Sequence, residues 1–239
     1  MRRVLLPRVS READSTREAV SHRGSGDPST GSVCSSVTPC LTAGMPPVLE
    51  PVATAKYDIA AAVVRPMVFT PNQCVSIILD AQIEGMSRAK ILRNGKSIYN
   101  WARTCDSCWL KRSEKTEWMY RIVENATAEV NETNFGFDLN GVQALQVLRY
   151  RPMQWFSWHV DVFPDSYRKL TAVFNLSKDV EDYRGGGFRI EGNQVYNREY
   201  QREIGSGLWF PSFIRHCARS PWKGERWVLV AWFTGPKFK

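Results

Sequence analysis

Residues 226–233, RWVLVAWF, form the stretch that decides the fold class. β-Branched and aromatic side chains fill this run and no turn-forming residue interrupts it, a composition typical of a buried β-strand. Because side chains along a strand alternate between its two faces, every second residue shares a face. The residues on the face of Arg226 are Val228, Val230 and Trp232. The run therefore predicts a buried strand with one cation at its start.

Shorter runs of the same kind precede this strand from Ala144 onward, and turn signals separate them. The runs are LQVLRY (145–150), WFSWHVDVF (155–163), KLTAVFNLS (169–177), GGGFRIEG (185–192), GLWF (207–210) and RHCA (215–218). Many short strands at this spacing are typical of a β-sandwich or a barrel. The chain from Ala144 onward is therefore predicted to be rich in β-strands.

Two helices are predicted ahead of the strands. Thr70 is a favourable N-cap and Pro71 a favourable first helical residue, so one helix should run from about Pro71 to Glu84. A second helix is expected over residues 114–131, where apolar side chains form one stripe above charged faces. Helices followed by strands give an α+β layout, in which the helices pack on one face of a barrel or jelly roll.

The first 53 residues differ in composition from the rest. They are rich in Ser, Arg and Pro without a periodic apolar pattern, so we expect a disordered arm over 1–53 and one folded domain over 54–239. Six cysteines show no disulfide spacing and the N-terminus has no apolar leader, which favours a cytoplasmic location. No apolar run approaches the roughly 18 residues of a membrane helix, so no membrane contact is expected.

The net charge of +8 belongs mainly to the predicted domain. Residues 1–50 hold six Arg against five Asp and Glu, a balance of +1, which leaves +7 for residues 51–239. The cations are scattered rather than gathered in blocks, so a solvated basic surface is favoured over a nucleic-acid site. A basic jelly-roll binding module without activity is the non-enzymatic alternative. Nothing in the composition indicates an oligomeric state.

A histidine and an aspartate lie two residues apart in SWHVDVF (157–163). In a strand, His159 and Asp161 point to the same face and offer an imidazole and a carboxylate to one point. Of the three histidines, His22 lies in the predicted arm, which leaves His216 as the other histidine of the domain. It follows His159 by 57 residues, far enough for a return strand to bring it beside the first pair.

Two imidazoles and one carboxylate on one face leave coordination positions open, as in the ligand set of non-haem Fe(II) oxygenases. On ligand type alone, a zinc hydrolase is an alternative. Arg226 follows ten residues after His216 and needs an anion, and a guanidinium binds a carboxylate through two parallel hydrogen bonds. A dicarboxylic co-substrate could bind the metal at one end and Arg226 at the other. A nearby Glu is the alternative partner of Arg226, and Lys223, in a turn, is the alternative cation.

These residues carry a family resemblance. HVD (159–161), His216 in RHCA and GERWVLVAWF (224–233) together resemble the Fe(II)- and 2-oxoglutarate-dependent dioxygenases, in particular their prolyl 4-hydroxylase-like branch. Four further segments resemble that branch in the same order: FTPNQC (69–74), ARTCDSCWL (102–110), LQVLRY (145–150) and DYRGGGFRI (182–190). The resemblance spans residues 67–234 and implies a double-stranded β-helix with the helices on one face.

The resemblance also implies roles for single residues. It implies iron on His159, Asp161 and His216, and 2-oxoglutarate, through its distal carboxylate, on Arg226. Tyr150, which stands nine residues before His159, matches a co-substrate contact of the family.

Three further residues are candidates at the same site. Thr171 and Asn175 share a strand face and could reach the co-substrate, with polar positions at a barrel edge as the alternative. Trp232 matches a tryptophan near the iron on the substrate side, with core filling as its alternative.

The implied reaction couples oxidative decarboxylation of 2-oxoglutarate, with Fe(II) and O2, to hydroxylation of an unactivated C–H bond, and releases succinate and CO2; ascorbate is the implied reductant. Asp161 counts against a halogenase, in which a small residue replaces this acid. The +7 balance and Gly187, where the family has a polar residue, favour a small, anionic metabolite or amino acid as substrate. Proline in a peptide or protein is the alternative. The candidate substrate cations are Arg168, Arg184 and Arg189.

Cys105 and Cys108 form a CxxC within residues 103–112, a segment that we expect to be a lid over the substrate. A single CxxC lacks the second ligand pair of a zinc site. We therefore expect two free thiols here, with a redox-sensitive lid as the alternative.

Overall fold

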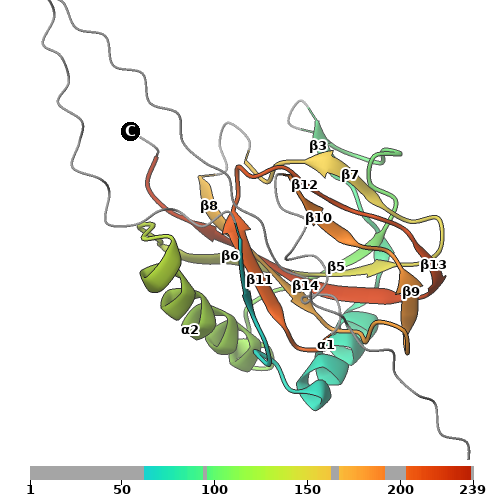
Figure 1. Cartoon of the computed structure of the whole chain (residues 1–239), viewed down its shortest axis with the longest axis horizontal. Coiled ribbons are helices and arrows are strands. Elements are labelled where there is room, and N and C mark those ends of the chain that lie inside the picture. The colour runs from blue at the N-terminus through green and yellow to red at the C-terminus, as the bar shows by residue number, and fades with distance from the viewer. Residues whose placement is uncertain (1–61, 94–95, 163–166, 192–202, 238–239) are drawn as a thin grey trace, which may run out of the picture. The chain divides into compact units, whose positions relative to one another are not determined.

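The computed structural model describes residues 62–93, 96–162, 167–191 and 203–237 (Figure 1). The predicted arm over 1–53 and the first residues of the predicted domain lie outside the described residues. The boundary between arm and domain therefore stays a prediction.

The largest element is a mostly antiparallel sheet of seven strands. In spatial order it contains β1 (Val63–Arg65), β11 (Gly207–Pro211), β8 (Arg168–Asn175), β14 (Arg226–Thr234), β6 (Gly141–Tyr150), β5 (Asp106–Leu110) and β2 (Ser87–Arg88). The stretch RWVLVAWF is β14, and it pairs with β8 on one side and β6 on the other. The strand that decides the fold class is thus the central strand of the sheet.

A second sheet of three strands packs over the inner face of the first. It consists of β10 (Phe188–Ile190), β12 (His216–Ala218) and β7 (Phe156–His159). Two further pairs complete the fold: β9 (Tyr183–Gly185) with β13 (Pro221–Gly224), and β3 (Ile91–Arg93) with β4 (Lys96–Ile98). The two facing sheets form the double-stranded β-helix that the sequence predicts.

Two helices cover the outer face of the seven-stranded sheet, on the side away from β7, β10 and β12 (Figure 1). Helix α1 (Pro71–Glu84) has the predicted bounds, because the Thr70 side chain accepts from the Gln73 N–H while the Gln73 side chain accepts from the Thr70 N–H. Helix α2 (Glu117–Asn134) starts three residues later than predicted. Thr116 receives the Ser113 N–H and donates to the Lys111 carbonyl, which holds these residues in a turn before the helix.

The alternation predicted for β14 separates two cores. One face, against the helices, carries Trp227, Leu229, Ala231 and Phe233. The other face, against the three-stranded sheet, carries Val228, Val230 and Trp232. Because both faces are covered, the strand is almost continuously apolar.

The predicted lid over residues 103–112 is wrong in its main part. Residues 106–110 form β5, which lies between β6 and β2 in the large sheet and pairs with β6 over five residues. The pairing partner lies about 40 residues away in the sequence, so the local pattern gives no sign of it. Neither helix in the described part of the chain is long and apolar enough to span a membrane.

Candidate metal centre and its two cavities

Strand pairing between β7 and β12 brings the two histidines together. His159 and His216 are direct partners in the antiparallel register, and their ring centroids lie 4.2 Å apart. Partners in such a ladder point to the same face. Two histidines that stand 57 positions apart in the sequence thus form one cross-strand pair.

Asp161 reaches the same place because the chain bends after β7. Its N–H donates to the Ser212 carbonyl at 2.9 Å, and its carboxylate accepts from the Thr171 hydroxyl at 2.8 Å. The Thr171 hydroxyl also contacts the Ser212 hydroxyl at 2.9 Å. These contacts fix the orientation of the carboxylate.

The hydrogen bonds of the two imidazoles define their free nitrogens. His159 Nδ1 lies 2.8 Å from the Ser157 carbonyl, and His216 Nδ1 lies 2.9 Å from the Ile214 carbonyl. A carbonyl only accepts, so each Nδ1 donates and each Nε2 keeps a lone pair. The Nε2 atoms lie 3.7 and 3.6 Å from the Asp161 carboxylate oxygens, so all three ligand atoms face one point.

The protonation states suit metal binding. Burial, with the neighbouring His216 adding to it, lowers the pKa of His159 to about 3. Burial opposes ionisation of Asp161, yet the two histidines and the Thr171 hydroxyl outweigh it and hold the pKa of Asp161 below its usual value. Neutral His159 and a carboxylate are the forms that bind a metal. One potential ligand atom from each of the three residues lies within 4.8 Å of the others, and no second such group occurs among the described residues.

A narrow inner pocket runs from this centre to Arg226. The Arg226 guanidinium is 1% exposed, and its Nε and Nη2 have no protein hydrogen-bond partner. A buried cation with free donors requires an anion, and a carboxylate matches its planar geometry. The donor set therefore fits a dicarboxylate such as 2-oxoglutarate, held between metal and guanidinium. The pocket is small, with a cavity volume of about 30 Å³.

The predicted co-substrate residues divide into two groups. Tyr150 and Thr171 line the inner pocket, and the Tyr150 ring lies 5.8 Å from the Arg226 guanidinium carbon. Thr171 is engaged with Asp161, so it orients a candidate ligand. Asn175 does not line the pocket: its side-chain amide donates to the Ser177 and Glu203 carbonyls. The expectation that Asn175 reaches the co-substrate is therefore not supported.

A second, outer cavity of about 590 Å³ lies on the other side of the metal centre. Trp232 borders both cavities and packs against Trp109, with ring centroids 5.6 Å apart. Arg168 lines the outer cavity and its guanidinium lies 4.2 Å from the Trp232 ring centroid. Trp232 and Arg168 thus both line the outer cavity, and their roles toward a substrate stay predictions.

Three expectations about the outer wall are wrong. Arg184 and Arg189 are exposed and line neither cavity, because alternation in β10 buries Phe188 and Ile190 and turns Arg189 to the solvent. Gly187 borders a separate surface depression, so its missing side chain does not enlarge the metal-side cavities.

Two residues at the site, Arg103 and Tyr183, were not among the site residues predicted from the sequence. Arg103 borders both cavities, donates to the Gln146 side chain at 2.9 Å and lies 4.7 Å from the Phe156 ring centroid. The Tyr183 side chain contacts Arg226 and forms a hydrogen bond with it. Arg103 lies in the segment 102–110 and Tyr183 in the segment 182–190. Both segments carry the family resemblance, which is the signal that could have identified these residues.

The CxxC cysteines are buried free thiols, as expected. Cys105 and Cys108 form no disulfide, and burial raises the pKa of each thiol. Low reactivity follows, because the thiolate is the reactive form.

Comparison with known proteins supports the interpretation of this geometry. A family model described as the 2OG-Fe(II) oxygenase superfamily matches residues 145–234. No curated protein sequence matches the chain. Similar solved structures include the viral collagen prolyl hydroxylase of Paramecium bursaria Chlorella virus-1, with 16% identity, a TM-score of 0.57 and coverage of 76% of this chain and 100% of that one.

Two other solved structures are similar. The prolyl-4-hydroxylase of Pseudomonas putida has 16% identity and a TM-score of 0.56, covering 74% of this chain and 94% of its own. The prolyl hydroxylase of Trichoplax adhaerens, solved with a peptide fragment of the hypoxia inducible factor oxygen degradation domain, has 15% identity and a TM-score of 0.60, covering 73% and 83%. These likenesses concern the fold.

These comparisons overturn the expectation of a small-molecule substrate, because the similar structures named here are prolyl hydroxylases and one of them holds a peptide. They agree with the expected cofactors, Fe(II), 2-oxoglutarate and O2, and with an enzyme rather than an inactive binding module. The residues matched by the family model of the 2OG-Fe(II) oxygenase superfamily, 145–234, include all three converging side chains and Arg226, so this segment is similar to that superfamily in sequence and carries the matching donor set.

Proposed function

We propose that this protein is a prolyl 4-hydroxylase that acts on a peptide or protein segment. The reaction inserts one oxygen atom of O2 into the C4–H bond of a proline and the other into succinate, while 2-oxoglutarate loses CO2. The observation that carries the proposal is the outer cavity, which opens directly beside the candidate metal ligands and is far larger than a single proline needs.

Each residue of the centre has a defined task in this proposal. His159, Asp161 and His216 hold Fe(II), and Arg226 binds the distal carboxylate of 2-oxoglutarate. Bound iron supplies the oxidising chemistry, and the chain fixes the position of the reacting C–H bond relative to it. Thr171 keeps the Asp161 carboxylate turned toward the two histidines.

The lining of the outer cavity suits an extended peptide. Trp109, Trp158 and Trp232 all border it, and Trp109 and Trp158 keep 49% and 42% of their surface exposed. Aromatic-lined grooves are a recurring way to bind proline-containing segments, because the rigid ring packs flat on an indole at little entropic cost. His159 and Asp161 border the same cavity, so a proline held there lies next to the metal centre.

The test is hydroxylation of proline-containing peptides by the full chain with Fe(II) and 2-oxoglutarate. We expect a gain of one oxygen mass on proline, matched by succinate, and neither product with the His159→Ala variant. Location of the hydroxyl at C4 follows from amino-acid analysis of the product. Succinate release that depends on a free amino acid or other metabolite, with no peptide modified, would refute the proposal.

A further inference from the structure

The charged side chains around the outer cavity are almost all of one sign. Four cations line it: Arg88, Lys90, Arg103 and Arg168. Among the described residues, the single acid in the lining is Asp161, whose carboxylate already faces the two histidines and Thr171. The cavity in front of the metal centre therefore attracts negative charge.

Two of the four cations are committed to the cavity wall. Arg103 is buried, donating to the Lys90 carbonyl and the Gln146 side chain. Arg168 donates to the Gln143 side chain and lies over the Trp232 ring. These two cations position side chains as well as carrying charge.

Arg88 and Lys90 differ from them. Both are exposed, and neither forms an ion pair with an acid of the described residues. The nearby Arg149 and Arg151, by contrast, are both paired with Asp106. The Lys90 ammonium lies 5.0 Å from the Tyr99 ring centroid. Within the part of the chain that the structure describes, Arg88 and Lys90 are thus cations at the cavity without an acidic partner.

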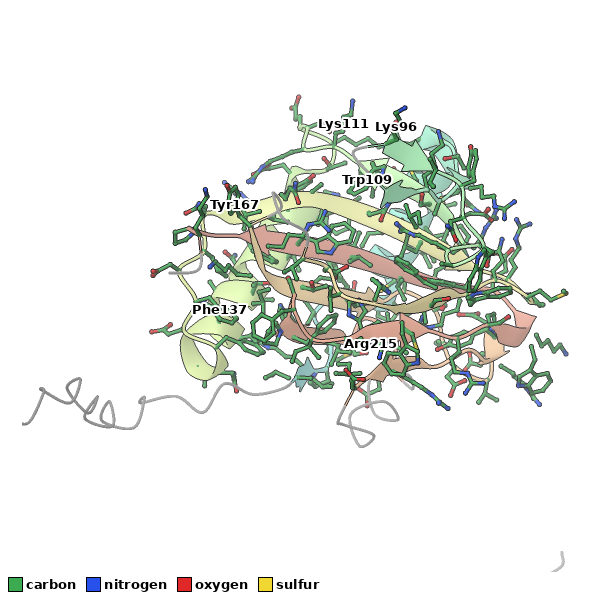
Figure 2. All side chains as sticks on the ribbon, turned by 90° about the horizontal axis from the view of Figure 1, so that it is seen from above. Lys96, Trp109, Lys111, Phe137, Tyr167 and Arg215 are labelled. Carbon is green, nitrogen blue, oxygen red and sulfur yellow. The ribbon has the colours of Figure 1, made fainter. Side chains whose placement is uncertain are left out.

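The aromatic side chains define where a ligand lies relative to these cations. Trp109, on β5, borders the cavity together with Ser97 of the β3–β4 hairpin, and Figure 2 shows Trp109 on the same side of the molecule as Lys96 of that hairpin. Arg88 belongs to β2, the strand that pairs with β5. A proline packed on Trp109 would therefore place its neighbouring residues within reach of this cationic edge.

We propose that the outer cavity selects peptides whose target proline is flanked by Asp or Glu, and that Arg88 and Lys90 are the specificity-determining cations. This inference rests on the proposed function. A basic surface with exposed indoles also suits single-stranded nucleic acid. The peptide is favoured because the four cations all line one cavity whose lining also includes the candidate metal ligands His159 and Asp161, where a proline would have to lie.

The experiment compares three peptides of equal length with one central proline, flanked by Asp and Glu, by Asn and Gln, or by Lys and Arg. Binding to the full-length holoenzyme is measured by fluorescence anisotropy, and turnover by the oxygen mass gain. We expect the order acidic, neutral, basic in both affinity and kcat/KM, with the acidic preference shrinking as salt rises.

The Arg88→Gln/Lys90→Gln double variant tests the assigned residues. We expect its acidic-to-neutral ratio of kcat/KM to fall by roughly fivefold, as two partly exposed charge pairs predict. The matched control is Arg184→Gln/Lys223→Gln, which removes the same charge from exposed partners on the β9–β13 pair, outside both cavities. It should keep the wild-type ratio.

The outcomes separate the two proposals. Hydroxylation of all three peptides with equal efficiency overturns the charge preference and leaves the prolyl 4-hydroxylase function standing. Preferred binding of the acidic peptide without any hydroxylation supports the cavity assignment and refutes the function. The inference is overturned if both double variants lose the acidic preference equally. It is also overturned if an oligonucleotide displaces the acidic peptide at a lower concentration than a second acidic peptide does.

Discussion

The inner pocket and the outer cavity share the same metal centre but are built by opposite means. The inner pocket is lined mainly by apolar strand residues, and the two buried guanidinium groups at it are Arg226, with two free nitrogens, and Arg103, which also borders the outer cavity. The outer cavity is wide, half exposed and lined by cations and tryptophans. The inner pocket thus holds its anion-binding group, Arg226, in a buried position, whereas the outer cavity adds two exposed cations, Arg88 and Lys90.

We expect this difference to divide the work of the two cavities: the inner pocket serves the reaction, and the outer cavity determines which substrate is used. A buried charge interacts strongly and tolerates little change, because water does not replace its partner. Exposed charges are screened and contribute less per pair. Substitutions in the metal centre and inner pocket should therefore abolish or cripple turnover, while substitutions in the outer cavity should change which substrate is used.

The largest effect is expected at the metal centre. His216→Ala removes one of three ligand atoms and should reduce succinate formation to background, and thermal unfolding without metal should show that the variant folds. Arg219→Gln, three residues further on and exposed, is the control and should retain activity. Turnover of His216→Ala at the wild-type rate would show that His216 is not a required metal ligand, and the expected difference between substitutions at the metal centre and in the outer cavity would then fail.

Arg226→Gln comes next. It leaves the co-substrate carboxylate without its buried cation and should raise the KM for 2-oxoglutarate by about 30-fold or more, because truncating a buried charge pair costs roughly 2–5 kcal/mol. Arg226→Lys keeps the charge but loses the fork, so its KM should lie between those of the wild type and Arg226→Gln. Steady-state kinetics with varied 2-oxoglutarate measures both, and an unchanged KM would remove Arg226 from the site.

Thr171→Val tests the hydrogen bond that orients the candidate metal ligand Asp161, and leaves the three ligands themselves unchanged. Loss of the 2.8 Å hydrogen bond to Asp161 should weaken metal binding by about 10- to 100-fold, the usual range for partners of ligating residues. Titration with Fe(II) or Mn(II) under anaerobic conditions measures this. Thr133→Val on α2, whose hydroxyl only donates to the Glu129 carbonyl, should bind metal as the wild type does; a similar loss there would point to a general effect on stability.

The smallest effect is expected for Tyr183→Phe. It removes a hydroxyl that contacts Arg226 but leaves the guanidinium in place, so the KM for 2-oxoglutarate should rise by about three- to tenfold, as for one hydrogen bond. The kcat at saturating 2-oxoglutarate should change less than the KM. A drop in kcat with an unchanged KM would mean that Tyr183 does not act through Arg226.

Much of this architecture follows from local sequence. The bounds of α1 are encoded by Thr70, Pro71 and Gln73, which act within one turn. Strand alternation predicts that His159 and Asp161 lie together, although Asp161 reaches His159 through a bend just past the end of β7, and His216 was the remaining histidine of the predicted domain. These inferences need no knowledge of which strands pair.

The parts that sequence reasoning missed depend on pairing between distant segments. Residues 106–110 look like an isolated run beside a CxxC and become a sheet strand only because β6 lies next to them. Asn175 shares the strand face of Thr171, yet the Ser177 and Glu203 carbonyls bind its amide below the pocket. The position of Arg189 was within reach of alternation, since both of its neighbours are apolar and one strand face must be exposed.

The pairing of His159 with His216 has a consequence for how the protein is made. During synthesis the two halves of the metal site leave the ribosome 57 residues apart, and Arg226 follows ten residues later still. Domains are synthesised from the N-terminus at about 5–20 residues per second, so for several seconds the nascent chain carries HxD without its partner strand. Iron cannot acquire its full ligand set, nor the co-substrate its buried cation, until β12 and β14 have joined their sheets. The complete site is thus assembled only after Arg226 has left the ribosome.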